Sequence, residues 1–83
     1  MNETIRELLG RVGGLPMAVK DIANEADLYG AGLSSFASVQ LMLAIEEAFD
    51  IEFPDALLNR KSFASINAIE ETVTQILKSR EAA

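Results

Sequence analysis

The fold of this 83-residue chain is decided by the stretch SSFASVQLMLAIEEAF, residues 34–49. Two serines that can cap a helix precede a run without Gly or Pro, which predicts a helix over Phe36–Phe49 with Ser34 or Ser35 as its N-cap. At about 100° per residue, one side of this helix is apolar, as expected for packing on a core. That side carries Leu41, Met42, Ile45 and Phe49.

Two further helices are predicted on either side of this stretch. The first spans Asn2 to about Val12, where apolar residues recur at helical spacing before the cluster at 13–16 ends it: Ile5, Leu8, Leu9 and Val12. The second spans Ser65 to about Lys78, with Ser65 as its N-cap. Its apolar stripe contains Ile66, Ile69, Val73, Ile76 and Leu77.

The connecting segments have weaker patterns. Residues 17–32 are predicted to form a long loop, Pro54 is predicted to open a short helix near 55–59, and residues 79–83 are expected to fray. No segment has strand and hairpin chemistry. We therefore predict a single all-α domain over residues 1–83, a small four-helix bundle of three main helices and one short one.

Composition excludes several classes of function. The chain has no Cys and no His, so it lacks the usual metal ligands and the usual general base, which argues against a self-sufficient enzyme and a metal site. Its net charge of −6 opposes binding to nucleic acid or anionic membranes. Its N-terminus lacks the pattern of a signal peptide and no apolar run could span a bilayer, so we expect a location in the cytoplasm. We also expect a monomer.

The negative charge is concentrated in the middle of the chain. No Lys or Arg lies between Lys20 and Arg60, whereas eight carboxylates do, so this segment carries −8 and the two ends together +2. The pattern favours a basic protein partner that binds the middle segment. The alternative is an acidic surface that serves only solubility.

The 36–49 helix has a second apolar face. Phe36, Val39 and Leu43 lie opposite the expected core side, next to acidic residues at the end of the helix: Glu46, Glu47 and Asp50. Apolar contact area flanked by carboxylates is typical of a surface that docks a basic partner. The alternative is a central helix covered on both sides, and burial of the three apolar side chains would favour it.

Ser35 stands where the loop meets the start of this helix. Helix N-termini have unpaired N–H groups and the positive end of the dipole, so a phosphate group attached to this hydroxyl would be stabilised. The alternative is that Ser34 and Ser35 are ordinary capping residues. Helix physics alone does not decide between the two.

The runs DLYGAGLSSFASVQL (27–41) and AIEEAFDIEFP (44–54) resemble the acyl and peptidyl carrier protein family. In that family a loop ends in Asp-Ser-Leu, an apolar and acidic helix follows, and a Glu-Glu-x-Phe…Pro stretch closes it. The resemblance covers about residues 27–77. It departs from the family at two positions, with Ser34 in place of the Asp and Phe36 in place of the Leu.

The resemblance implies a function for these residues. Ser35 matches the serine to which a phosphopantetheinyl transferase attaches 4′-phosphopantetheine, and the thiol of that group would hold cargo as a thioester. Partner enzymes would contact the apolar and acidic positions of the following helix, among them Phe36, Val39, Leu43, Glu46, Glu47 and Asp50. Catalysis would then belong to the partners, which agrees with the absence of Cys and His.

Within the family, the variant Gly32–Phe36 and the short chain look most like the discrete aminoacyl carrier proteins. The resemblance implies loading with a small amino acid by a ligase similar to the catalytic core of a seryl-tRNA synthetase, and a downstream acceptor enzyme. Two alternatives stay open: an acyl carrier for fatty acid, lipid or polyketide assembly, and an unmodified helical adaptor for protein interactions.

Overall fold

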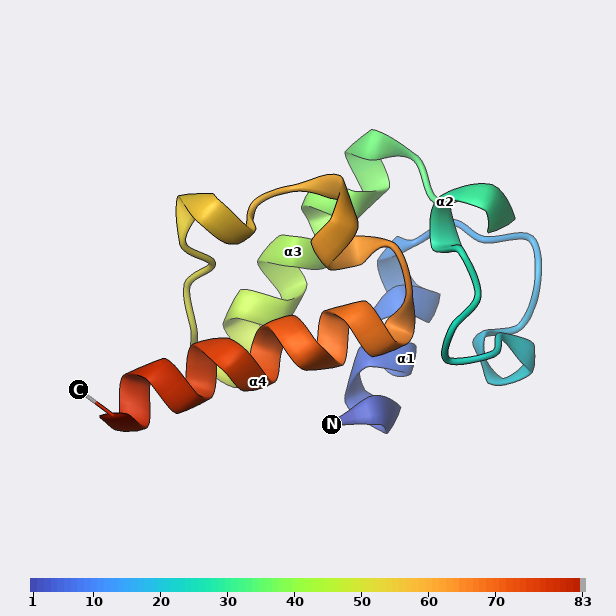
Figure 1. Ribbon diagram of the computed structural model, residues 1–83. Helices are drawn as coiled ribbons and strands as arrows, with labels where there is room; N and C mark the ends of the chain where they lie inside the picture. Colours follow the sequence, from blue (N-terminus) through green and yellow to red (C-terminus); the bar gives the residue numbers. More distant parts are fainter. Residues whose placement is uncertain (83) are drawn as a thin grey trace.

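Three long helices form the body of the computed structural model, which describes the backbone of residues 1–82 and the side chains of residues 1–80 (Figure 1). These are α1 (Asn2–Val12), α3 (Ser35–Phe49) and α4 (Ile66–Ala82). A short helix, α2 (Leu28–Ala31), precedes α3. No strand occurs in the described part, so the predicted all-α bundle is confirmed.

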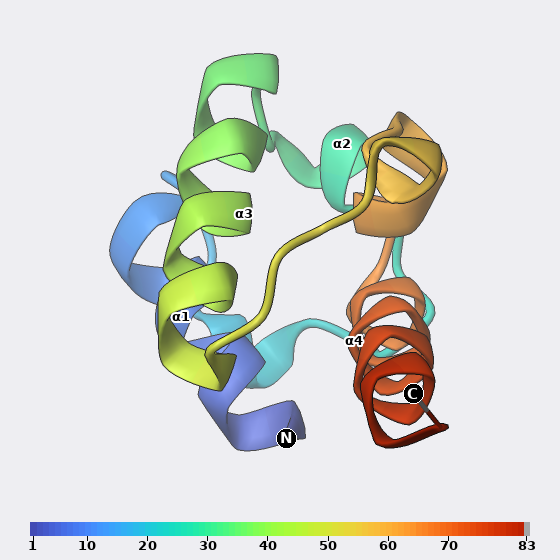
Figure 2. The same cartoon turned by 90° about the vertical axis from the view of Figure 1, so that its left-hand side faces the viewer.

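The core lies where one face of each long helix meets the others. The fully buried side chains include Ile5 and Leu9 of α1, Leu41 and Ile45 of α3, and Ile66, Ile69 and Val73 of α4. α1 contacts both α3 and α4, and Figure 2, a view along α4, shows α1 and α3 together on one side of that helix. The helical periods in the sequence therefore identified the core faces of all three helices. None of the described helices is long and apolar enough to cross a membrane.

The segment between α1 and α3 is more ordered than the loop that the sequence predicts. It contains a 3-10 turn, η1 (Val19–Asp21), and α2, whose first turn is capped by the Asp27 carboxylate accepting from the Tyr29 N–H at 3.1 Å. The Leu28 N–H also donates to the Ala64 carbonyl at 2.8 Å, which fixes α2 next to the start of α4. Gly32 is the C-cap of α2 and has φ +123°, a backbone conformation that residues with side chains disfavour.

The structure also corrects the prediction of a short helix near residues 55–59. Pro54 does open a helical turn, but that turn is a 3-10 segment of three residues, η2 (Asp55–Leu57). A second 3-10 segment, η3 (Arg60–Phe63), follows it and contacts α4. The fourth α-helix of the bundle is thus α2, and 3-10 turns occupy the connection between α3 and α4.

The C-terminal helix continues past its predicted end at Lys78. It is helical through Ala82, so the tail expected to fray is helical at residues 79–82, and Ala83 lies outside the described residues. The Arg80 guanidinium donates to the Asp50 carbonyl, which ties the last turns of α4 to the end of α3. The start of α4 agrees with the sequence, since the Ser65 hydroxyl accepts from the Ala68 N–H at 3.0 Å.

The chain reverses direction directly after α3. The backbone of Asp50 is in the left-handed conformation (φ 53°), and the Ile51 N–H donates a hydrogen bond of 3.0 Å to the Glu46 carbonyl. The chain then crosses to η2 and η3, which face α3 from the other side of the molecule (Figure 2). The rings of Phe53 and Phe63, with centroids 5.3 Å apart, hold this crossing segment against η3.

Candidate functional site

The two adjacent serines at the start of α3 have different surroundings. Ser34 is the N-cap, with extended backbone and a hydroxyl that accepts from the Ala37 N–H at 3.0 Å. Ser35 is the first residue of the helix, and its side chain is exposed and forms no hydrogen bond with the described side chains. Its carbonyl accepts from the Ser38 hydroxyl at 2.8 Å. The cap is therefore Ser34, and the Ser35 hydroxyl is available for chemistry.

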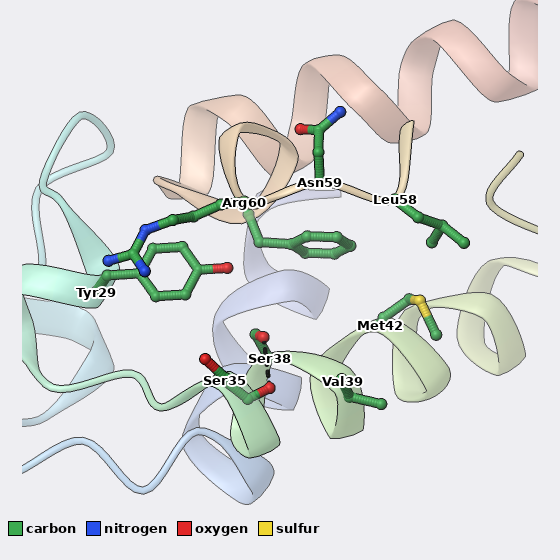
Figure 3. A pocket seen from close by; sticks show the side chains of 9 residues that line it. Tyr29, Ser35, Ser38, Val39, Met42, Leu58, Asn59 and Arg60 are labelled. Atoms are coloured by element: carbon green, nitrogen blue, oxygen red, sulfur yellow. Dashed lines mark hydrogen bonds between the residues drawn. The ribbon is translucent and has the colours of Figure 1, made fainter. Parts of the chain in front are cut away.

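A groove of about 450 Å³ runs beside Ser35 (Figure 3). On one side it is lined by α3, through Ser35, Ser38, Val39 and Met42. On the other side it is lined by Tyr29 of α2 and by the segment around η3, through Leu58, Asn59, Arg60 and Phe63. The sequence provided no indication of this groove, because the wall around η3 is distant along the chain from the walls formed by α2 and α3.

Arg60 and Tyr29 meet at one end of the groove. The guanidinium carbon of Arg60 lies 4.0 Å from the centroid of the Tyr29 ring, and Figure 3 shows the two side chains together. This distance is typical of a cation–π contact. The groove thus combines an apolar wall with one positive charge.

The predicted second apolar face of α3 is open to solvent. Phe36 is 75% exposed, and Val39 and Leu43 are each 50% exposed. These values contradict the alternative of a central helix covered on both sides. Exposed large apolar side chains that are contiguous on one helix face are typical of interaction sites.

The acidic residues near the end of α3 do not share one environment. Glu47 and Asp50 are exposed beside this apolar face. Glu46 is half-buried, and its Oε2 accepts from the Phe53 N–H at 2.9 Å, so this carboxylate is engaged within the fold. The sequence did not reveal that bond because its two groups are seven residues apart, on either side of the chain reversal.

The site has the features needed to hold a phosphodiester-linked group. An exposed hydroxyl stands in the first turn of a 15-residue helix, beside a groove and an exposed apolar face. Among the described residues no cluster of three or more carboxylates or other ligands could hold a metal ion. The residues present therefore fit attachment and presentation of a bound group.

Comparisons with known proteins agree with this geometry. The model of the family described as "Phosphopantetheine attachment site" matches residues 3–73. The aminoacyl carrier protein of Agrobacterium fabrum is 75% identical over 83 residues, which are 100% of both chains. The chain belongs to the phosphopantetheine-binding carrier proteins.

Solved structures of carrier proteins share this fold. A carrier protein from Agrobacterium tumefaciens, crystallised with an engineered Bradyrhizobium japonicum glycine:[carrier protein] ligase and AMP, is 77% identical. The match covers 89% of this chain and 99% of that one, with a TM-score of 0.88. A glycylated carrier protein in complex with the B. japonicum ligase is 30% identical over 86% of this chain and 95% of its own, with a TM-score of 0.74.

The predicted resemblance is thus confirmed, together with the phosphopantetheine cofactor and the carrier function. The chain is an aminoacyl carrier protein and not a catalyst. Phosphopantetheine, once attached, would supply the thiol that holds the aminoacyl group, while the protein supplies the attachment site.

Proposed function

We propose that Ser35 is the residue that carries 4′-phosphopantetheine, and that the carrier protein accepts glycine as a thioester from a glycine:[carrier protein] ligase. The observation that carries the proposal is the difference between the two serines at the start of α3. Ser34 is engaged as the cap, whereas the Ser35 hydroxyl is exposed and unengaged among the described side chains. Its position in the first helical turn also stabilises a negative phosphodiester.

The ligase is proposed from the relatives. Two similar carrier proteins have been crystallised with glycine:[carrier protein] ligases, one of them in glycylated form. The exposed residues of α3 would form the docking surface for this ligase, for the phosphopantetheinyl transferase and for a downstream acceptor enzyme. These residues are Phe36, Val39, Leu43, Glu47 and Asp50, with Glu46 at the edge.

The physical basis of docking is contact area combined with charge. Phe36 supplies the largest exposed apolar side chain, and the carboxylates of Glu47 and Asp50 attract a basic partner and set its register. The net charge of −6 opposes nucleic acid and anionic lipid as partners. We propose a monomer that works in the cytoplasm.

A loading experiment tests the cargo. Holo carrier protein, ATP and a glycine:[carrier protein] ligase are incubated with a panel of amino acids, and fatty acids are offered separately with an acyl-activating ligase. We expect the intact mass to rise by one glycyl group, and the Ser35→Ala variant to stay unchanged. Loading with fatty acids and with none of the amino acids would instead support the acyl carrier alternative.

A further inference from the structure

The segment between α1 and α2 is held in place mainly by polar contacts. Residues 19–26, which we call the strap, contain η1 and lie at the edge of the molecule before α2 begins (Figure 1). Within the strap only Ile22 is buried, while Val19 and Ala26 are half-buried and the other five residues are exposed. The strap therefore contributes little apolar area to the core, and hydrophobic burial alone holds it weakly.

Arg6 of α1 forms the main bonds to the strap. Its guanidinium donates to the Val19 carbonyl and, at 2.7 Å, to Asn24 Oδ1, so one side chain binds the strap on both sides of Ile22. Its Nε also donates to Asn2 Oδ1 at 2.7 Å, which orients the guanidinium, and Asn2 Nδ2 donates to Asn24 Oδ1 at 3.0 Å. The planar guanidinium thus serves three acceptors in a fixed geometry that neither a Gln amide nor a Lys ammonium reproduces.

The stripe of α1 that meets the strap carries no large apolar side chain. Asn2, Arg6 and Gly10 are spaced four residues apart, so they lie along one side of the helix. At Gly10 the strap passes close to the helix, since a Cβ at this position would lie 3.5 Å from Val19 Cγ1. On this stripe the contact is therefore made through polar groups and a glycine, which bury little apolar area.

The bonds of the strap to α4 are also polar, and they end where α2 begins. The Asn67 N–H donates to the Asn24 carbonyl at 2.9 Å, and Asn67 Nδ2 donates to Glu25 Oε1 at 3.2 Å. Beyond the strap, Leu28 is fully buried and its N–H donates to the Ala64 carbonyl. Because α2 has this anchor of its own, the strap can move while α2 and the start of α3 stay in place.

We propose that the strap is a conformational device latched by Arg6, which opens and closes as one unit while α1, α3 and α4 stay folded. In the open state the bonds from Arg6 and Asn67 to the strap are broken, and Ile22 leaves the core. Polar bonds that are lost together make the opening cooperative, and the small apolar area keeps its free energy below that of global unfolding. The device does not depend on the phosphopantetheine arm proposed at Ser35.

Hydrogen exchange of the apo protein, followed by nuclear magnetic resonance, tests the proposal. The Ile22 and Asn67 N–H groups report the opening, because both of their acceptors are strap carbonyls. The amides of Leu41 and Val73, fully buried residues of α3 and α4, report the core. We expect the two strap reporters to have similar protection factors, about tenfold or more below those of the core reporters. Equal protection of all four amides, or no protection at the strap reporters, would overturn the proposal.

A pair of variants tests the latch. Arg6→Gln removes the guanidinium that binds the strap, and Arg11→Gln removes an exposed charge from the last turn of the same helix. We expect Arg6→Gln to accelerate exchange at the strap reporters about tenfold or more, because bonds from a charged donor no longer oppose opening. Arg11→Gln is expected to change these rates by less than about twofold. Equal effects of the two variants would overturn the assignment of the latch to Arg6.

Ile45→Val separates local opening from global unfolding. It removes a fully buried methyl group from α3, so it destabilises the folded core whether the strap is open or closed. We expect exchange at the core reporters to rise about threefold or more and exchange at the strap reporters to stay within about twofold. Equal acceleration at all four amides would show that the strap opens only when the whole chain unfolds, which would contradict the proposal. This measurement does not require the Arg6 variant to fold.

Discussion

Glu46 and Glu47 are adjacent on α3 but have different roles in the structure. Glu46 is half-buried and accepts from the Phe53 N–H, which stabilises the chain reversal after the helix. Glu47 is exposed and has no such bond among the described residues. Substitutions at Glu46 would therefore combine effects on folding with effects on the proposed docking, while substitutions at Glu47 would test the proposed docking alone.

Glu46→Ala is expected to lower the free energy of unfolding by about 1–2 kcal/mol, because the Phe53 N–H loses its acceptor. Glu46→Gln retains an acceptor oxygen, so we expect a smaller loss. The measurement is urea denaturation followed by circular dichroism. Glu47→Ala is the matched control, with a change within about 0.5 kcal/mol. Equal losses for the Glu46→Ala and Glu47→Ala variants would contradict the structural role of Glu46.

At the scale of the element, the start of α3 depends on Ser34. Ser34→Ala removes the oxygen that accepts from the Ala37 N–H and is expected to destabilise the protein by about 1 kcal/mol. Ser34→Asp, which introduces the residue usual in the family, keeps an acceptor and is expected to retain stability. Thermal and urea unfolding of both variants check this, with Ser35→Ala as the control that keeps the cap. Destabilisation by Ser35→Ala equal to that by Ser34→Ala would show that the cap is wrongly assigned.

The long helices were predictable because each has a periodic apolar face. The bounds of α1 agree with the prediction, and the core residues of α3 and α4 follow from the spacing of residues such as Leu41 and Val73. The sequence did not predict α2, because a helix of four residues that includes Gly30 is too short to show a periodic apolar pattern. α2 is instead stabilised by the Asp27 cap and by the hydrogen bond from the Leu28 N–H to the Ala64 carbonyl. The end of α4 was missed because its contact with Asp50 is a tertiary one.

The site was predictable only in part. Ser35 and the exposed apolar face could be found from the family pattern and from helical geometry, although the sequence left Ser34 and Ser35 equal as caps. The groove was out of reach because Tyr29 and Arg60 are 31 residues apart and meet only through the packing of α2 and η3. Contacts between residues so far apart along the chain produce no periodic pattern or motif in the sequence.

At the scale of the whole molecule, the charge is unevenly distributed, and this bears on the proposed docking of partners. We propose that the −8 of the middle segment steers a basic partner toward the exposed face of α3, an effect that salt would screen. We expect Glu47→Lys to slow loading by the ligase, and to slow it more at low than at high ionic strength. Asp50 is less suitable for this test because its backbone is in the left-handed conformation and its carbonyl accepts a hydrogen bond from Arg80.

Glu71→Lys on α4 is the matched control for this charge reversal. It changes the net charge by the same amount at an exposed position on another helix. Initial rates of aminoacylation at several salt concentrations compare the two variants. Equal slowing by both would indicate that net charge alone matters, which would contradict docking on α3.

The attachment of the arm is the central claim, and intact mass measures it directly. The wild-type chain and its Ser34→Ala and Ser35→Ala variants are each co-expressed with a broad-specificity phosphopantetheinyl transferase, alongside a control carrier. We expect one added phosphopantetheine on the wild-type and Ser34→Ala chains and none on Ser35→Ala. An added group on Ser35→Ala, or none on the wild-type chain while the control carrier is modified, would contradict the account.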